Sequence, residues 1–84
     1  MDFSGAIFTP HATQQMSRRG LSQADVRQVL AAPEELLPVR ADRVVAQAMI
    51  GAYLVRVFVD VDRTPVEIVT AYRTSQLAKY RSRP

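Results

Sequence analysis

The sequence predicts an α+β domain in which two N-terminal helices pack on a four-stranded antiparallel sheet, with a short helical turn at the C-terminal end. Two short segments before Pro33 have helix-capping residues and apolar residues at helical spacing. Strand-like segments rich in β-branched and aromatic residues follow them. The connections between these strands are too short for the crossovers that parallel strands require, so we expect an antiparallel meander.

The composition is that of one ordinary folded domain. The chain has 84 residues, and we expect a single domain over residues 1–84 with a core of about 8–73. A hydrophobic fraction of 48% argues against disorder. The absence of cysteine excludes disulfides and fits a reducing cytosol, so we expect a cytoplasmic protein. We expect neither a secretory signal nor a membrane-spanning segment, because no long apolar run is present.

The charge balance favours anionic partners. The formal net charge is +3, and the sequence pI is about 10.0. A basic small domain is suited to contact either nucleic acid or an acidic protein. We therefore expect a partner of one of these two classes and no membrane partner.

The first helix is predicted over residues 10–19. Thr9 precedes it as an N-cap residue, and a proline occupies its first position, where no backbone N–H is needed. Gly20 suits the left-handed residue that ends a helix. Ser22 is expected to cap a second helix that Pro33 ends, so the two helices form an αα-hairpin. Apolar residues at helical spacing are predicted to bury one face of this second helix: Val26, Val29 and Leu30.

The rest of the chain is predicted to form strands over four ranges: 35–40, 43–50, 53–60 and 66–73. The first range contains a proline, which suits an edge strand. Gly51-Ala52 is expected to join the second strand to the third as a tight hairpin turn. The last two strands are apolar on nearly both faces, so we place them at the centre of the sheet, with the helices covering one side. Residues 75–84 are predicted either to form one more helical turn or to be a solvated end.

Strict alternation assigns the strand side chains to the two faces of the sheet. In the third strand one face is predicted to hold Tyr53, Val55, Val57 and Val59. The opposite face of that strand is predicted to hold Leu54, Arg56, Phe58 and Asp60. In the last strand the same rule puts on one face Val66, Ile68, Thr70 and Tyr72.

A polar and basic stripe is predicted along the first helix, because an α-helix advances about 100° per residue. It consists of His11, Gln15, Arg18 and Arg19. Ala12 and Met16 lie beside the stripe and can face the core. One imidazole and two guanidiniums on a small basic domain indicate phosphate chemistry, although a solvated helix face would have the same pattern.

Metal-independent RNA cleavage needs a base, an acid, and cations that stabilise the negative charge on the phosphate. His11 is the only side chain here whose unperturbed pKa lies near neutrality, so it is the candidate for proton transfer. A histidine that caps or packs near the start of the helix is the alternative. The predicted catalytic residues are His11, Arg19, Arg56 and Tyr72.

The other roles follow from the chemistry of each side chain. Arg56 lies mid-strand among apolar neighbours, where a charge needs solvent, a partner or a ligand. Arg19 can clamp phosphate through its forked donors, or it can face solvent or form a salt bridge with Asp25 or Glu34. Tyr72 can stack on a base or supply a phenol proton, or it can belong to the core. Additional predicted nucleic-acid-binding residues are Arg18, Arg73, Lys79 and Arg81.

No metal site and no cofactor are expected. Asp60 and Asp62 form a D-x-D pair, but they flank a predicted turn and have no nearby histidine. Glu34 and Glu35 are likewise isolated, so turn and surface roles are preferred for all four carboxylates. The sequence also has no glycine-rich phosphate loop and no nucleophile elbow.

Several short motifs resemble a bacterial family of domains of unknown function, over roughly residues 8–73. The opening of that family typically has a His-Ala pair, an Arg-Met or similar pair, then Arg-Gly-Ile-Ser and a valine in the second helix. The matching residues here are His11-Ala12, Met16, Arg19-Gly20-Leu21-Ser22 and Asp25-Val26. The strand over 66–72, with Thr70 and Tyr72, resembles the closing strand of the family.

That family is similar to the RelE/ParE toxin superfamily, and especially to BrnT-like toxins. The resemblance implies two helices on a four-stranded antiparallel sheet, and a small basic ribonuclease made beside an inhibitory antitoxin. Many family members have arginine at the position of Gln15, and the charge of Arg18 could replace it from the next turn of the helix.

The sequence therefore predicts an RNA-binding, metal-independent endoribonuclease of a toxin-antitoxin module. Its expected partners are RNA and an acidic antitoxin protein. The alternative is a non-catalytic binding module that engages an acidic protein or nucleic acid, because Gln15 replaces arginine and no second clear acid or base is present. A homodimer that pairs through exposed sheet edges is a further arrangement that the apolar strands permit.

Overall fold

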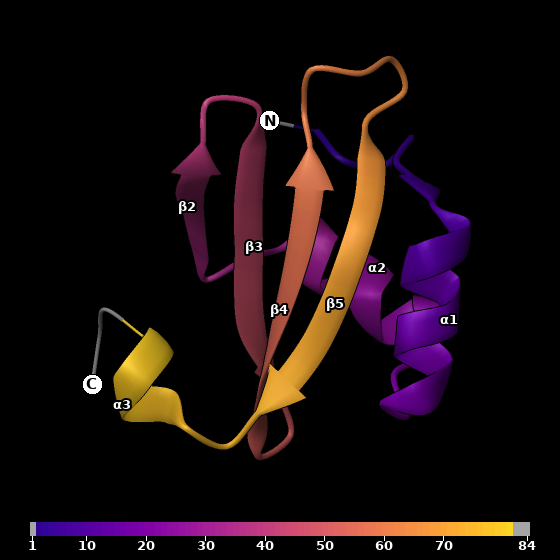
Figure 1. Cartoon of the computed structure of the whole chain (residues 1–84). Coiled ribbons are helices and arrows are strands. Elements are labelled where there is room, and N and C mark those ends of the chain that lie inside the picture. The colour runs from indigo at the N-terminus through magenta and orange to yellow at the C-terminus, as the bar shows by residue number, and fades with distance from the viewer. Residues whose placement is uncertain (1, 82–84) are drawn as a thin grey trace.

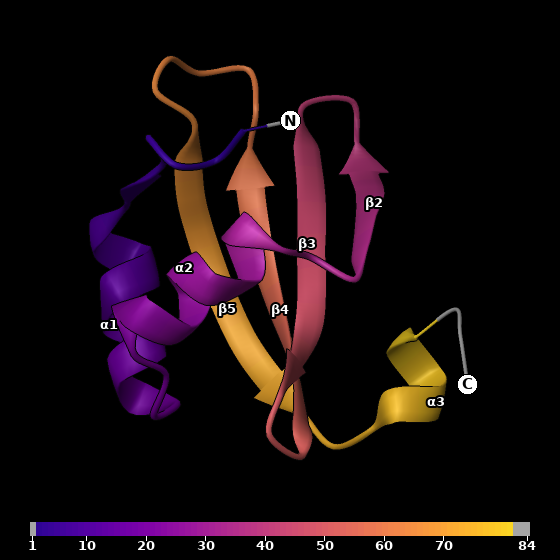
Figure 2. The same cartoon turned by 180° about the vertical axis from the view of Figure 1, so that it is seen from behind.

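The computed structural model describes residues 2–81. The elements in chain order are β1 (Ile7–Phe8), α1 (Pro10–Arg18), α2 (Gln23–Ala31), β2 (Glu35–Arg40), β3 (Arg43–Ile50), β4 (Tyr53–Asp60), β5 (Glu67–Thr74) and α3 (Leu77–Tyr80). Helices α1 and α2 lie behind the sheet in Figure 1 and in front of it in Figure 2. The predicted α+β class, with both long helices on one face, is confirmed.

Side-chain caps begin both helices, as predicted. The Thr9 hydroxyl accepts a hydrogen bond from the Ala12 N–H at 3.1 Å, and the Ser22 hydroxyl accepts one from the Asp25 N–H at 3.0 Å. These caps satisfy backbone donors that have no partner inside a helix. Gly20 has φ +69°, a left-handed conformation that reverses the chain between the helices at little steric cost. Helix α1 ends at Arg18, one residue before the predicted end.

The sheet has five strands in the order β1-β5-β4-β3-β2, which corrects the prediction of four antiparallel strands. The additional strand β1 pairs with β5 in parallel, and the Ile7 N–H donates to the Val66 carbonyl at 3.0 Å. The remaining pairs are antiparallel, as expected. A two-residue strand was missed because it is too short to show any alternation of apolar and polar residues.

The strand β2 forms one edge of the sheet, as predicted. Leu36 and Val39 on this strand are 40% and 49% exposed. Pro38 has no N–H to offer to another strand, which opposes pairing of this edge with a second chain.

An irregularity in β5 corrects the predicted assignment of its faces. Phe58 pairs with Thr70, but the next residue, Val59, pairs with Ile68, so Val69 is an extra residue in β5. Such a bulge breaks the alternation of side chains. Ile68 therefore belongs to the helix-facing core, while Tyr72 pairs with Arg56 on the opposite face. The prediction that these two residues share a face was wrong.

The core lies between the sheet and the two long helices. Its strand residues include Val55, Val57, Val59, Ile68 and Ala71, and its helix residues include Ala12, Met16, Val26, Val29 and Leu30. The helical faces predicted from apolar spacing are thus the buried ones. None of the helices within residues 2–81 is long and apolar enough to cross a membrane.

The opposite face of the sheet, which α1 and α2 leave uncovered, is called the open face below. Its residues include Gln47, Arg56, Phe58, Thr70 and Tyr72. The predicted C-terminal turn is present as α3, which brings Tyr80 to this face near Gln47. Residues 82–84 of the predicted range lie outside the described residues.

Candidate nucleic-acid interface

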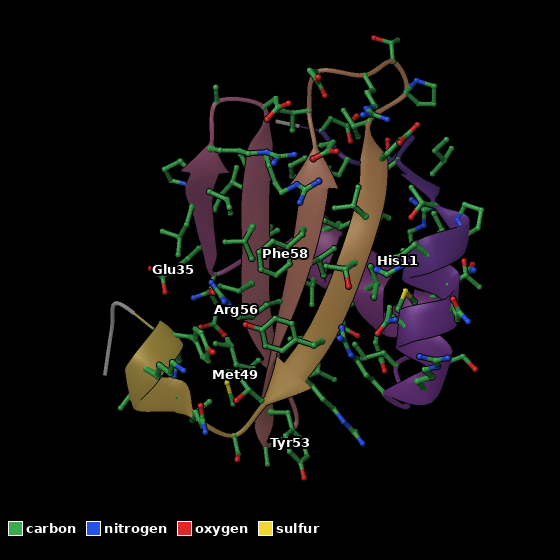
Figure 3. All side chains as sticks on the ribbon, viewed as in Figure 1. His11, Glu35, Met49, Tyr53, Arg56 and Phe58 are labelled. Carbon is green, nitrogen blue, oxygen red and sulfur yellow. The ribbon has the colours of Figure 1, made fainter. Side chains whose placement is uncertain are left out.

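Arg56 is the centre of a polar and aromatic cluster on the open face (Figure 3). Its Nε donates to the Gln47 Oε1 at 2.8 Å, and its Nη1 donates to the Tyr72 hydroxyl at 2.6 Å. Three aromatic rings surround the guanidinium carbon, with centroids at 5.5, 5.8 and 4.3 Å: those of Phe58, Tyr72 and Tyr80. The charge on an apolar strand thus has the partners that its position requires.

Gln47 positions Arg56, and sequence reasoning missed it. The residue lies directly opposite Arg56 on β3 and is fully buried. Its amide nitrogen donates to the Glu35 Oε1 at 3.1 Å and to the Tyr80 carbonyl at 2.9 Å. The amide oxygen accepts from Arg56, so both the nitrogen and the oxygen of this buried amide are hydrogen-bonded. Gln47 therefore fixes both the guanidinium and the end of α3.

Tyr72 and Tyr80 form a pair of phenols beside the guanidinium. Their rings meet edge to face with centroids 6.2 Å apart, and the Tyr72 ring also stacks on Phe58 at 6.0 Å. Burial raises the pKa of Tyr72. The hydrogen bond from the Tyr72 hydroxyl lowers the pKa of Tyr80. Of the two hydroxyls, that of Tyr80 thus loses its proton more readily.

Arg19 reaches this cluster from the end of α1. Its Nη1 donates to the Ala71 carbonyl at 2.9 Å and to the Thr70 hydroxyl at 3.3 Å. Its guanidinium carbon lies 5.9 Å from the centroid of the Tyr72 ring. The alternative ion pair with Asp25 or Glu34 is not formed. Three of the four predicted catalytic residues, Arg19, Arg56 and Tyr72, are therefore neighbours.

His11 lies apart from these three residues. It is exposed on the first turn of α1, and Figure 3 places it on the α1 side of β5, whereas Arg56 lies toward α3. The capping role belongs to the preceding Thr9 rather than to the imidazole. These contacts do not test the proton-transfer role predicted for His11, and its place outside the cluster leaves proton transfer there to another side chain.

The predicted nucleic-acid-binding residues occupy three different environments. Arg18 is exposed at the end of α1. Arg73 shares the helix-facing side of the sheet with Val55, and its guanidinium lies 4.9 Å from the Tyr53 ring centroid. The Lys79 Nζ lies 5.2 Å from the Tyr80 ring centroid on the open face.

Arg81 is the only member of that predicted set that is paired with an acid among the described residues. Its Nη2 donates to the Glu34 Oε1 at 2.8 Å. The Met49 N–H, assisted by Arg81, lowers the pKa of Glu34. The ion pair joins the residue after α3 to the residue before β2. The charge of Arg81 is therefore paired within the chain, and its role here is to hold α3 against the sheet.

Most of the ion pairs lie at one end of the molecule. The residues Arg40, Arg43 and Arg63 form ion pairs with Asp42, Asp60, Asp62 and Glu67. These residues flank the β2–β3 and β4–β5 connections at the top of Figure 1. Toward the other end, Arg81 pairs with Glu34, and the basic residues without an acidic partner in the described chain include Arg18, Arg19, Arg56, Arg73 and Lys79. The excess positive charge is therefore concentrated near the cluster.

The four carboxylates for which the sequence predicted turn and surface roles do not form a metal-binding cluster in the described part of the chain. Within residues 2–81 no group of three His, Cys, Asp or Glu side chains is placed to hold a metal ion. Asp60 instead accepts two hydrogen bonds from Arg43, at 2.6 and 3.1 Å. It is a buried ion-pair partner rather than the surface residue that the sequence predicted.

Fold and site together define a small α+β domain whose open sheet face holds an arginine among aromatic rings. Residues 8–73 match the family described as a domain of unknown function, DUF4258, and the chain belongs to that family. The expectation of such a family is thus confirmed, over the same span as the resemblance. No match to a curated protein or to a solved structure was found.

Proposed function

We propose that this domain binds single-stranded RNA on its open face and cleaves it without a metal, as a toxin of the RelE/BrnT type. One observation carries the proposal: Arg56 is fixed by Gln47 among three aromatic rings, with Arg19 beside them. Rings stack on unpaired bases, and forked guanidinium donors match phosphate oxygens.

The distribution of charge supports an anionic ligand at this place. Arg19, Arg56 and Lys79, which have no acidic partner in the described chain, lie in or beside the cluster, whereas three of the paired arginines lie at the far end. An RNA backbone would be attracted to this end, and so would an acidic protein. The proposed antitoxin is therefore an acidic protein that competes with RNA for the same residues.

The proposed cleavage is attack of a ribose 2′-oxygen on the adjacent phosphorus, which breaks the bond from phosphorus to the 5′-oxygen. A base accepts the 2′-hydroxyl proton, and an acid protonates the departing 5′-oxygen. Tyr80 is the proposed base, since its lowered pKa makes its phenolate more available than that of Tyr72, and the protonated Tyr72 is the proposed acid. Arg19 and Arg56 would stabilise the charge that builds on the phosphate.

Induced expression in a bacterial host tests this function. The wild-type chain is expected to arrest growth with RNA fragmentation, whereas Arg19→Ala and Tyr80→Phe are expected to permit growth. His11→Ala is the informative comparison, because His11 lies outside the cluster and its loss is expected to leave arrest intact. Folding of each variant is verified by circular dichroism.

The other outcomes of the expression experiment have definite meanings. Loss of arrest in folded His11→Ala would assign proton transfer to His11 and remove Tyr80 from the mechanism. Normal growth with folded wild-type protein would contradict a potent toxin. It would favour the non-catalytic binding module, in which Arg56 keeps its internal hydrogen bonds to Gln47 and Tyr72.

A further inference from the structure

A second site lies apart from the open face, between the N-terminal segment and α2. It is a pocket of about 430 Å³ lined by Asp2, Phe3, Ser4, Arg27, Leu30 and Ala31. This volume is within the range of pockets that hold small molecules, roughly 300–1,000 Å³. Helix α2 lies on the face of the sheet opposite to the open face (Figure 2). The pocket, which α2 residues line, is therefore on the other side of the sheet from Arg56.

Arg27 is the distinctive residue of this pocket. Its guanidinium carbon lies 4.8 Å from the centroid of the Phe8 ring. The Nη1 is shielded from solvent and has no hydrogen-bond acceptor. Arg27 makes neither a hydrogen bond nor an ion pair with any residue from 2 to 81. Buried donors are usually satisfied, so this guanidinium has hydrogen-bonding capacity that no residue from 2 to 81 uses.

The other residues that line the pocket indicate which kind of ligand would suit it. Phe3 and Leu30 are 3% and 5% exposed, and their side chains contribute apolar surface. Asp2 accepts a hydrogen bond from the Ser4 N–H at 2.8 Å, and this bond lowers the pKa of its carboxyl. A charged Asp2 at the pocket would repel a second negative group on a ligand.

We propose that this pocket binds a small organic monocarboxylate with an apolar body. The carboxylate accepts hydrogen bonds from Arg27, whose planar fork matches two carboxylate oxygens. The apolar body lies against Phe3 and Leu30, and burial of that surface favours binding. Asp2 selects against dicarboxylates of similar size.

A titration with phenylacetate followed by amide NMR shifts tests the site at constant pH and ionic strength. Phenylacetamide is the matched neutral probe, and phenylmalonate is the matched dianion. We expect saturable shifts at residues 2–4, 27, 30 and 31 with phenylacetate, and weaker binding of both other probes. Arg27→Met keeps the stem of the side chain and removes the donors, so affinity is expected to fall about tenfold or more.

Two more variants separate this pocket from a general attraction of anions. Ala31→Phe fills the pocket from the last turn of α2 and is expected to abolish the shifts. Arg18→Met removes an exposed arginine of α1 and is expected to leave affinity unchanged. The proposal is overturned if phenylacetate gives no saturable shifts at millimolar concentration, if phenylacetamide binds equally well, or if folded Arg27→Met binds like the wild type.

Discussion

Replacing Arg56 with methionine is expected to slow RNA cleavage by about 100-fold or more, the usual cost of removing one donor that stabilises charge in a transition state. Methionine keeps an unbranched apolar side chain against the three rings but has no charge and no donors. The rate is measured with a fluorescein-labelled single-stranded RNA and purified protein. The matched control is Arg40→Met, which removes an exposed charge on the far edge strand.

Arg56→Lys distinguishes charge from geometry at the same position. Lysine keeps the positive charge but loses the two-pronged donor that contacts Gln47 and Tyr72 together. We expect a rate between those of the wild type and Arg56→Met. If both folded Arg56 variants cleave as fast as the Arg40 control, the open face is not the catalytic site.

Replacing Asp60 with asparagine is expected to lower the free energy of unfolding by about 2–3 kcal/mol, because charge-assisted hydrogen bonds in a buried pair are lost. The Asp60 side chain is only 6% exposed and receives both hydrogen bonds from Arg43. Urea unfolding at pH 7 measures the loss. Asp62→Asn is the matched control, since its pair with Arg63 is exposed and is expected to contribute under about 0.5 kcal/mol.

The same ion pair predicts a dependence of stability on pH. The hydrogen bonds from Arg43 lower the pKa of Asp60 from its ordinary value of 3.8. The unfolded chain therefore takes up this proton first as pH falls. The contribution of the pair is complete above about pH 5 and is lost progressively as pH falls through 3.8 toward the lower folded value. Asp60→Asn should lack this loss; equal acid sensitivity of the wild type and the variant would contradict the assignment.

Local signals in the sequence were sufficient for the helices and the antiparallel strands. Single residues predict where the helices begin and where the chain reverses. The caps at Thr9 and Ser22 and the left-handed turn at Gly20 are all found at the expected positions. The strand β1 and the bulge at Val69 gave no such signal. Both depend on pairing between distant segments, and a one-residue irregularity leaves the composition of a strand unchanged.

The candidate site was only partly predictable for the same reason. A two-residue turn at Gly51-Ala52 pairs Ile50 with Tyr53, so counting outward pairs Gln47 with Arg56. Two polar residues opposite each other in apolar strands are a signal in the sequence from which the contact between Gln47 and Arg56 could have been predicted. Tyr80 gave no comparable signal, because the path of the chain after β5 is fixed by tertiary contacts with Gln47 and Glu34.

The most direct test of the central claim is an amide NMR titration of the wild-type chain with a short single-stranded RNA. We expect the largest shifts on the open face, at Gln47, Arg56 and Tyr72, with an affinity that falls as salt is raised. Shifts confined to α1 and α2, or no shifts at RNA concentrations that saturate known single-strand binders, would contradict the account.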